Sequence, residues 1–252
     1  MGIPGQATGM IEIDVIVPVA LKEVFADLGP GFRAASGIAL RRRHMLNPEV
    51  PGAAARGVPW DLALTNPPYA DAMVRAGLAE AGSAAAFGRS PLALAARGAA
   101  HGPPPRTAGS VRRVLRAAKA IAITDAGTSG AAFRVLARRL GLRKEEGARV
   151  LALEGGGPMR ALLAGEADLA VLPLTNVAPV RGVHAAAICP PVLGTHIDLT
   201  LCLRAGAPDG ARTLASWLLD PARDARLAAL GVERSRVSED ARAIEPRGLH
   251  HL

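Results

Sequence analysis

The 252-residue sequence is poor in aromatic residues and cysteine. Aromatic residues make up 3% of the chain, so the hydrophobic core has to be built mainly from Ala, Leu and Val. The two cysteines, Cys189 and Cys202, cannot form a disulfide framework, and no Cys or His pair stands at the spacing of a metal site. We expect two separate buried thiols, with a single disulfide between them as the alternative. The sequence predicts no metal and no cofactor.

Long hydrophobic runs are also missing. No apolar run approaches the roughly 18 residues that a membrane-spanning helix needs. The first ten residues show neither the basic nor the apolar region of a signal peptide, so we expect folded sequence to begin near Ile11. Residues 231–252 show no periodicity, which favours partial disorder there.

The charge of the chain is strongly positive. The formal net charge is +8, and lysine occurs only at positions 22, 119 and 144. The arginines are scattered, the only triplet is Arg41–Arg43, and no aromatic residues lie between them to stack on bases. We therefore exclude nucleic acid as a partner and interpret the charge as a general attraction for small anions.

The N-terminal part of the chain alternates between strand and helix patterns. Residues 11–17 have the pattern of a buried strand, and an amphipathic helix follows them. Strands at 38–43 and 60–64 and a helix through Met73 come next, whereas the proline-rich segment 47–59 favours a loop or a poorly formed helix. This order is typical of a parallel α/β sheet.

One stretch near the middle of the chain has the features of an anion site. Residues 118–123 form an apolar run of strand length, 125–130 a turn rich in glycine and hydroxyl groups, and 131–140 an amphipathic helix. A helix that begins at such a turn presents free N–H groups and the positive end of its dipole to an anion. Thr128 or Ser129 either caps this helix or offers its hydroxyl to the anion.

The remaining segments are two long extended stretches, shorter strands and closing helices. The extended stretches are expected at 87–96 and 188–204, the strands at 149–153 and 169–172, and the helices at 211–219 and 222–230.

The order of several short motifs carries a family resemblance. These motifs are Val17–Lys22, Asp61–Thr65, Phe87–Leu94, Ile123–Gly130, Gly165–Val171 and the closing segment Leu218–Gly231. In this order they resemble the type II periplasmic solute-binding proteins, and within them the molybdate-binding-protein-like branch with its aconitate-isomerase-like relatives. The resemblance covers about residues 11 to 232.

The resemblance implies an α/β fold with two lobes, each a mainly parallel sheet flanked by helices. Residues 11–88 and 200–232 would form lobe one and residues 89–199 lobe two, with tails at 1–10 and 233–252. Two extended crossings would join the lobes, so we expect the lobes to close on a ligand about a hinge.

The resemblance also implies a function. A small anion would bind between the lobes of a monomer, which would deliver it to the membrane permease of an ABC-type uptake system. The implied location is periplasmic, with the cytoplasm as the alternative because no signal peptide is visible. The implied ligand-binding residues are Val19, Ala20, Thr65, Asn66, Arg89, Ser90, Thr128, Ser129, Gly130 and Thr175.

Two departures from the family pattern point to the kind of anion. Ala20 stands where molybdate binders usually offer a serine hydroxyl, and Arg89 has a planar fork that suits a carboxylate. We therefore predict an organic di- or tricarboxylate as the ligand, with molybdate or another oxyanion as the alternative.

Two other classes of function stay open at this point. The first is an isomerase of a polycarboxylate such as aconitate, whose base would come from Tyr69, His196 or Asp198; we assign no catalytic residue. The second is a ligand-sensing regulatory domain, which the lack of a helix-turn-helix pattern disfavours.

Overall fold

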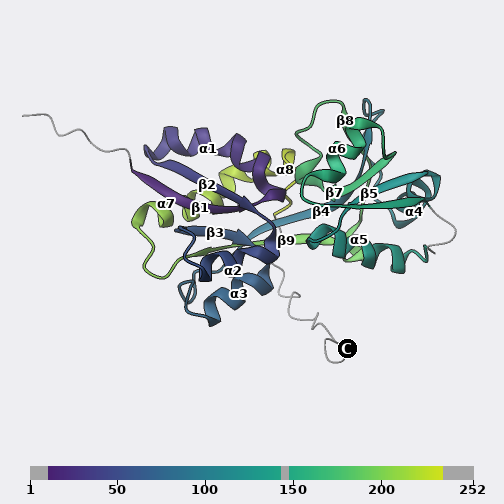
Figure 1. Cartoon of the computed structure of the whole chain (residues 1–252). Helices are drawn as coiled ribbons and strands as arrows, with labels where there is room; N and C mark the ends of the chain where they lie inside the picture. The colour runs from purple at the N-terminus through teal and green to yellow at the C-terminus, as the bar shows by residue number, and fades with distance from the viewer. Residues whose placement is uncertain (1–10, 143–147, 235–252) are drawn as a thin grey trace, which may run out of the picture.

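The computed structural model describes residues 11–142 and 148–234, and its elements alternate between strands and helices (Figure 1). The strands are β1 Glu12–Pro18, β2 Ala39–Met45, β3 Leu62–Thr65, β4 Ala85–Arg97, β5 Ala120–Thr124, β6 Arg149–Leu153, β7 Leu169–Pro173, β8 Val183–Ile188 and β9 His196–Leu203. The α-helices are α1 Lys22–Ser36, α2 Val50–Ala55, α3 Pro67–Arg75, α4 Ala108–Ala117, α5 Thr128–Arg139, α6 Gly157–Ala164, α7 Asp209–Leu219 and α8 Asp224–Ala229. The described residues also form the short 3₁₀ helices η1 Val19–Leu21, η2 Asn47–Glu49, η3 Leu174–Asn176, η4 Pro191–Leu193 and η5 Pro221–Arg223.

The strands form two sheets that share one long strand. In lobe one, β1 pairs in parallel with β2 and β3, and β3 pairs with β9 in antiparallel orientation. In lobe two, β5 pairs in parallel with β6 and β7. The N-terminal part of β4 pairs with β9 and its C-terminal part with β7 and β8. Thus β4 and β9 both run between the lobes (Figure 1).

Each sheet is covered by helices on both faces, which explains the nearly continuous apolar strands. In β1, Ile13, Val15 and Val17 belong to the main hydrophobic cluster with α1 and α7, whereas Ile16 belongs to a separate cluster with α2 and α3. Because successive strand residues point to opposite faces, one apolar run serves two layers. Lobe two repeats this arrangement, with α5 and α6 on opposite faces of β5.

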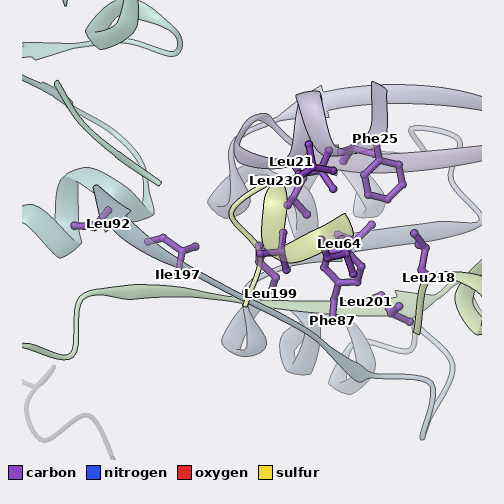
Figure 2. Packing of buried hydrophobic residues seen from close by; sticks show 14 of the residues in the cluster. Leu21, Phe25, Leu64, Phe87, Leu92, Ile197, Leu199, Leu201, Leu218 and Leu230 are labelled. Carbon is purple, nitrogen blue, oxygen red and sulfur yellow. The ribbon is translucent and has the colours of Figure 1, made fainter. Parts of the chain in front are cut away.

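The main hydrophobic cluster continues through the crossing between the lobes. Phe87 and Leu92 of β4 and Ile197 and Leu199 of β9 are buried there (Figure 2). Leu230, which follows α8, belongs to the same cluster. The crossing is therefore part of the core. The residue boundaries that we predict for the lobes stay a prediction, because β4 contributes to both sheets and β9 runs between the lobes.

Several element boundaries differ from the expectation. Helix α5 begins at Thr128, three residues before the expected start. The segment 47–59 contains η2 and α2, and the stretch expected to be extended from 188 to 204 is interrupted by η4, where Pro190 and Pro191 stand in sequence. Strand β8 was not expected, because its residues Val183–Ile188 contain three alanines and lack a clear apolar run.

The end of the described chain returns to the crossing. The backbone N–H of Arg89 donates to the carbonyl of Glu233 at 2.8 Å, and that of Glu233 donates to the carbonyl of Arg89 at 2.7 Å. Glu233 was expected to begin a tail, but it pairs with β4. The other expected tail residues, 1–10 and 235–252, lie outside the described residues.

Both cysteines are free and buried, as expected from the sequence. Burial raises the pKa of the Cys189 thiol to about 11 and that of Cys202 to about 12, so both stay protonated at neutral pH. Within residues 11–142 and 148–234, no helix has the length and apolar character needed to cross a membrane.

Candidate ligand-binding cleft

A cavity of about 290 Å³ lies between the two lobes. Both lobes and strand β9 contribute to its walls. Its lining residues are Val19, Ala20, Lys22, Glu23, Leu46 and Asn47 from lobe one, Thr124, Gly127, Thr128, Ser129, Gly155, Gly156, Met159, Arg160, Leu172, Pro173, Asn176 and Val180 from lobe two, and Ile197 from β9.

The fold brings strand ends and helix starts to this cavity. Strand β1 leads into η1, β5 into α5 and β7 into η3, and residues at each of these turns line the cavity. The carboxyl ends of parallel strands meet at one edge of a sheet, which is where α/β folds bind ligands. The first N–H groups of a helix have no partner within the helix. Neither α5 nor α6 has an acidic residue in its first turn, so their dipoles favour an anion.

Ser129 and Thr128 line the cavity from the first turn of α5. Gly127 is the N-cap residue, and no side chain caps the helix. Neither hydroxyl therefore acts as a cap. The Ser129 hydroxyl lies 3.4 Å from Oγ1 of Thr124, which also lines the cavity.

Gly130 does not line the cavity; it lies where α5 packs against the end of β5. A Cβ atom at this position would stand 1.8 Å from the carbonyl oxygen of Thr124. Only glycine allows this close approach, so the residue sets the position of α5 and hence of Ser129.

Two side chains expected at the ligand, Asn66 and Thr65, lie one layer behind the cavity wall. Asn66 accepts a 2.7 Å hydrogen bond from the Thr128 hydroxyl and donates a 2.6 Å bond to the carbonyl of Asp198. The buried Thr65 donates through Oγ1 to the carbonyl of Asn47 at 3.2 Å. These residues hold Thr128 and Asn47, which do line the cavity.

Three further expected residues, Arg89, Ser90 and Thr175, lie away from the cavity wall. The Nε atom of Arg89 is 3.4 Å from Oδ1 of Asp198. Ser90 and Thr175 are fully buried, and the backbone N–H of Thr175 donates to the Ser90 hydroxyl at 3.2 Å. Of the ten expected residues, the lining therefore includes Val19, Ala20, Thr128 and Ser129.

Several polar lining residues were not expected from the sequence: Lys22, Glu23, Asn47, Arg160 and Asn176. Asn47 is only 6% exposed, and its Oδ1 atom has no hydrogen-bond partner among the described residues. It lies in the proline-rich segment that was expected to form a loop or a poorly formed helix. Asn176 directly follows the expected residue Thr175, and its Nδ2 atom donates to the carbonyl of Val19 at 3.4 Å across the cleft.

The bases considered for an isomerase do not line this cavity. Nε2 of His196 is 3.3 Å from Oδ2 of Asp198 on the crossing strand β9. Burial by itself would raise the pKa of Asp198, but the hydrogen bond from His196 and the charge of Arg89 hold that pKa below its ordinary value. Tyr69 lies on α3. Tyr69, His196 and Asp198 are thus not among the residues that line this cavity.

Two sheets joined by two crossing strands, with a cleft between them, define the type II periplasmic-binding-protein fold. The periplasmic molybdate-binding protein of Azotobacter vinelandii has this fold with a TM-score of 0.73 at 17% identity, over 89% of this chain and 100% of that chain. The substrate-binding domain of a putative molybdenum ABC transporter from Clostridium difficile has a TM-score of 0.70 at 13% identity, over 89% of this chain and 99% of that chain. The sulfate-binding protein SubI of Mycobacterium tuberculosis has a TM-score of 0.65 at 14% identity, over 88% of this chain and 86% of that chain.

The sequence itself identifies the family. Residues 13–233 match the model of the bacterial extracellular solute-binding proteins, and the chain belongs to this family. No curated protein matches the sequence.

Proposed function

We propose that this protein captures a small oxyanion between its lobes for uptake by an ABC-type transporter. The observation that carries the proposal is a cavity between the lobes on which helix starts from both lobes converge, at Val19–Ala20, Thr128–Ser129 and Gly155–Gly156. Free N–H groups from several directions suit an anion that accepts hydrogen bonds on all sides.

An oxyanion fits this cavity better than the carboxylate that we predicted from the sequence. That prediction rested partly on Arg89, whose side chain faces Asp198 and does not line the cavity. The other ground of that prediction, Ala20, does line the cavity, and its missing hydroxyl counts against an oxyanion by on the order of 1–3 kcal/mol. Thr124 and Ser129 are hydroxyl donors that lie on the same cavity wall. Structural likeness to proteins named for molybdate and sulfate supports the same choice.

The partner and the location follow from the proposed role. A binding protein of this family that works outside the cytoplasm hands its solute to a membrane permease. We propose that this chain acts as a monomer in the periplasm or an equivalent extracellular space, with an ABC permease as its partner.

Calorimetric titration with molybdate, tungstate, sulfate and phosphate tests the proposal. At least one of these anions should bind with micromolar or tighter affinity and raise the melting temperature, because a ligand at about 100 times its Kd stabilises the folded state by about 2.7 kcal/mol. Citrate and malonate serve as carboxylate controls. If none of the four oxyanions binds, or if only the carboxylates bind, the proposal is wrong.

A further inference from the structure

The cavity is larger than a bare tetrahedral oxyanion needs. Its volume is about 290 Å³, whereas one water molecule takes up roughly 30 Å³ of liquid. The four oxygens of an oxyanion therefore fill about half of the cavity or less. The side chains of Leu46, Met159, Leu172, Val180 and Ile197 give the remaining space a largely apolar wall. Such a wall suits a short carbon chain attached to the anion.

Two cations line the same cavity from opposite lobes. Lys22 is the first residue of α1 in lobe one, and Arg160 lies on α6 in lobe two. Neither side chain forms an ion pair or hydrogen bond with another described residue. Both are exposed, which puts them at the mouth of the cavity and away from the buried Ser129. Two unpaired cations facing one cavity favour a second negative charge on the ligand.

Two hydrogen-bond acceptors also line this cavity, and they would suit a positively charged group on the ligand instead of a second negative one. Glu23 offsets one of the two positive charges, and the buried Oδ1 atom of Asn47 has no hydrogen-bond partner in the described part of the chain. A buried polar atom of this kind points to a ligand that reaches it, because leaving it unpaired costs about 1–3 kcal/mol. Asn47 can serve an oxyanion through its NH₂ group or a donor through Oδ1. An ammonium group on the ligand would use Glu23 and Asn47, whereas a carboxylate would use Lys22 and Arg160.

We propose that the natural ligand is a short organic acid with two anionic groups: an oxyanion head at the helix starts, and a carboxylate at the mouth between Lys22 and Arg160. Short phosphonates, sulfonates or phosphate esters with a carboxylate form this class. The inference rests on the proposed function and narrows its ligand. Since the two cations come from different lobes, the carboxylate also bridges the lobes and favours their closure.

Four phosphonates with a common head and different tails test this inference by calorimetry on the full chain. Methylphosphonate presents the head alone, propylphosphonate a neutral tail, phosphonoacetate a carboxylate tail and 2-aminoethylphosphonate an ammonium tail. Phosphonoacetate should bind at least about five-fold more tightly than propylphosphonate in low salt, and the difference should shrink in 0.5 M salt because exposed charges are screened.

Variants of the two cations identify the residues responsible. Arg160→Gln and Lys22→Met should each remove most of the advantage of phosphonoacetate and change the affinity for propylphosphonate by less than two-fold. Arg113→Gln is the matched control, because Arg113 is exposed on α4 and does not line the cavity. All three positions are exposed, and circular dichroism checks that the variants fold.

Other outcomes overturn the inference in distinguishable ways. Equal affinities for phosphonoacetate and propylphosphonate, or an equal loss for both in Arg160→Gln, show that the mouth holds no second anionic group. A preference for 2-aminoethylphosphonate assigns the tail to Glu23 and Asn47. If inorganic oxyanions bind but no phosphonate does, the inference fails and the proposed function stands. If neither kind binds, the proposed function fails as well.

Discussion

The hydroxyl of Thr128 donates a 2.7 Å hydrogen bond to Oδ1 of Asn66, and this bond joins α5 of lobe two to the end of β3 in lobe one. The amide of Asn66 is held in turn by its 2.6 Å bond to the carbonyl of Asp198 on β9. Thr128 lines the cavity, but its hydroxyl donates its proton to Asn66 of the other lobe and not to a ligand. Thr128 therefore belongs both to the cavity wall and to the contact between the two lobes.

Replacing Thr128 with valine should weaken ligand binding through this contact. The change keeps the shape of the side chain and removes one hydrogen bond, whose net contribution is about 0.5–1.5 kcal/mol. Calorimetry with the tightest oxyanion of the panel should show a loss of roughly two- to twelve-fold. Thr213→Val on the exposed side of α7 is the control. A double-mutant cycle with Asn66→Ala that gives no coupling energy would contradict this account.

Ser129 should contribute directly to the anion. Ser129→Ala is expected to lower the affinity roughly ten-fold, about 1.4 kcal/mol, and to leave the melting temperature of the ligand-free protein within a few degrees. Ser129→Asp should nearly abolish binding, because its carboxylate would occupy the place of the anion and repel it. Ser216→Ala, at an exposed position of α7, is the control. Titrations in which both Ser129 variants bind like the wild type would locate the anion elsewhere.

Ligand binding should make the molecule more compact. The lobes are joined by β4 and β9, and two crossings permit closure about a hinge. Small-angle scattering should give a smaller radius of gyration at saturation with the tightest oxyanion than in its absence. The Thr128→Val variant should show a larger ligand-free radius than the wild type. An unchanged radius at saturation counts against a closing cleft.

The two helical glycines Gly130 and Gly109 should respond to alanine in opposite directions. At Gly130 a Cβ atom would meet the Thr124 carbonyl at 1.8 Å, so Gly130→Ala should cost at least about 1–3 kcal/mol of unfolding free energy. At Gly109 in α4 nothing lies within 4 Å, so Gly109→Ala should stabilise the protein by about 0.5–1 kcal/mol. Urea denaturation measures both. Equal effects would show that α5 does not pack as closely as described.

Asp168 should make stability depend on acid pH. The backbone N–H groups of Lys119 and Ala120 donate to its Oδ2 atom at 2.7 and 2.9 Å, and they hold its pKa below the ordinary value of 3.8. Because the folded-state pKa is the lower one, the stabilisation is present above pH 3.8 and is lost as the pH falls below it.

An Asp168→Asn variant tests this dependence. The asparagine carboxamide cannot carry the negative charge that these two N–H groups stabilise. The variant protein should therefore be less stable than the wild type at pH 7. The difference should narrow as the pH falls through 3.8. Urea denaturation at several pH values gives both curves, with Asp71→Asn on the exposed part of α3 as the control. A difference that stays constant with pH would show that the charge of Asp168 plays no part.

The fold could be predicted largely because its strands are buried on both faces and so appear as short apolar runs. The runs that form β1, β5 and β7 were expected within two residues of their bounds. β8 was missed, because three of its six residues are alanine, which favours helices and is depleted in strands. The start of α5 was placed too late because glycine and hydroxyl residues suggest a turn, and here they form its first helical turn.

The site was harder to predict, because which residues face the cavity depends on tertiary packing. The glycine turn before α5 gave a local signal for Thr128 and Ser129. Arg89 was expected at the ligand, but its partner Asp198 lies on the antiparallel strand β9, and single-sequence patterns do not show that pairing. Asn47 faces the cavity only because the segment after β2 folds back over the end of β3.

The buried thiols have a practical consequence for measuring ligand capture. Cys189 and Cys202 are buried and remain protonated at neutral pH, so a maleimide dye reacts slowly with either of them. A cysteine introduced at Glu154, an exposed residue that directly precedes the lining residue Gly155 and does not itself line the cavity, would then be the preferred point of attachment without removing the native cysteines. A dye placed there would sit beside the moving edge of the cleft, and its emission would change with occupancy. One added cysteine would therefore suffice to make a fluorescent sensor for the solute that this protein binds.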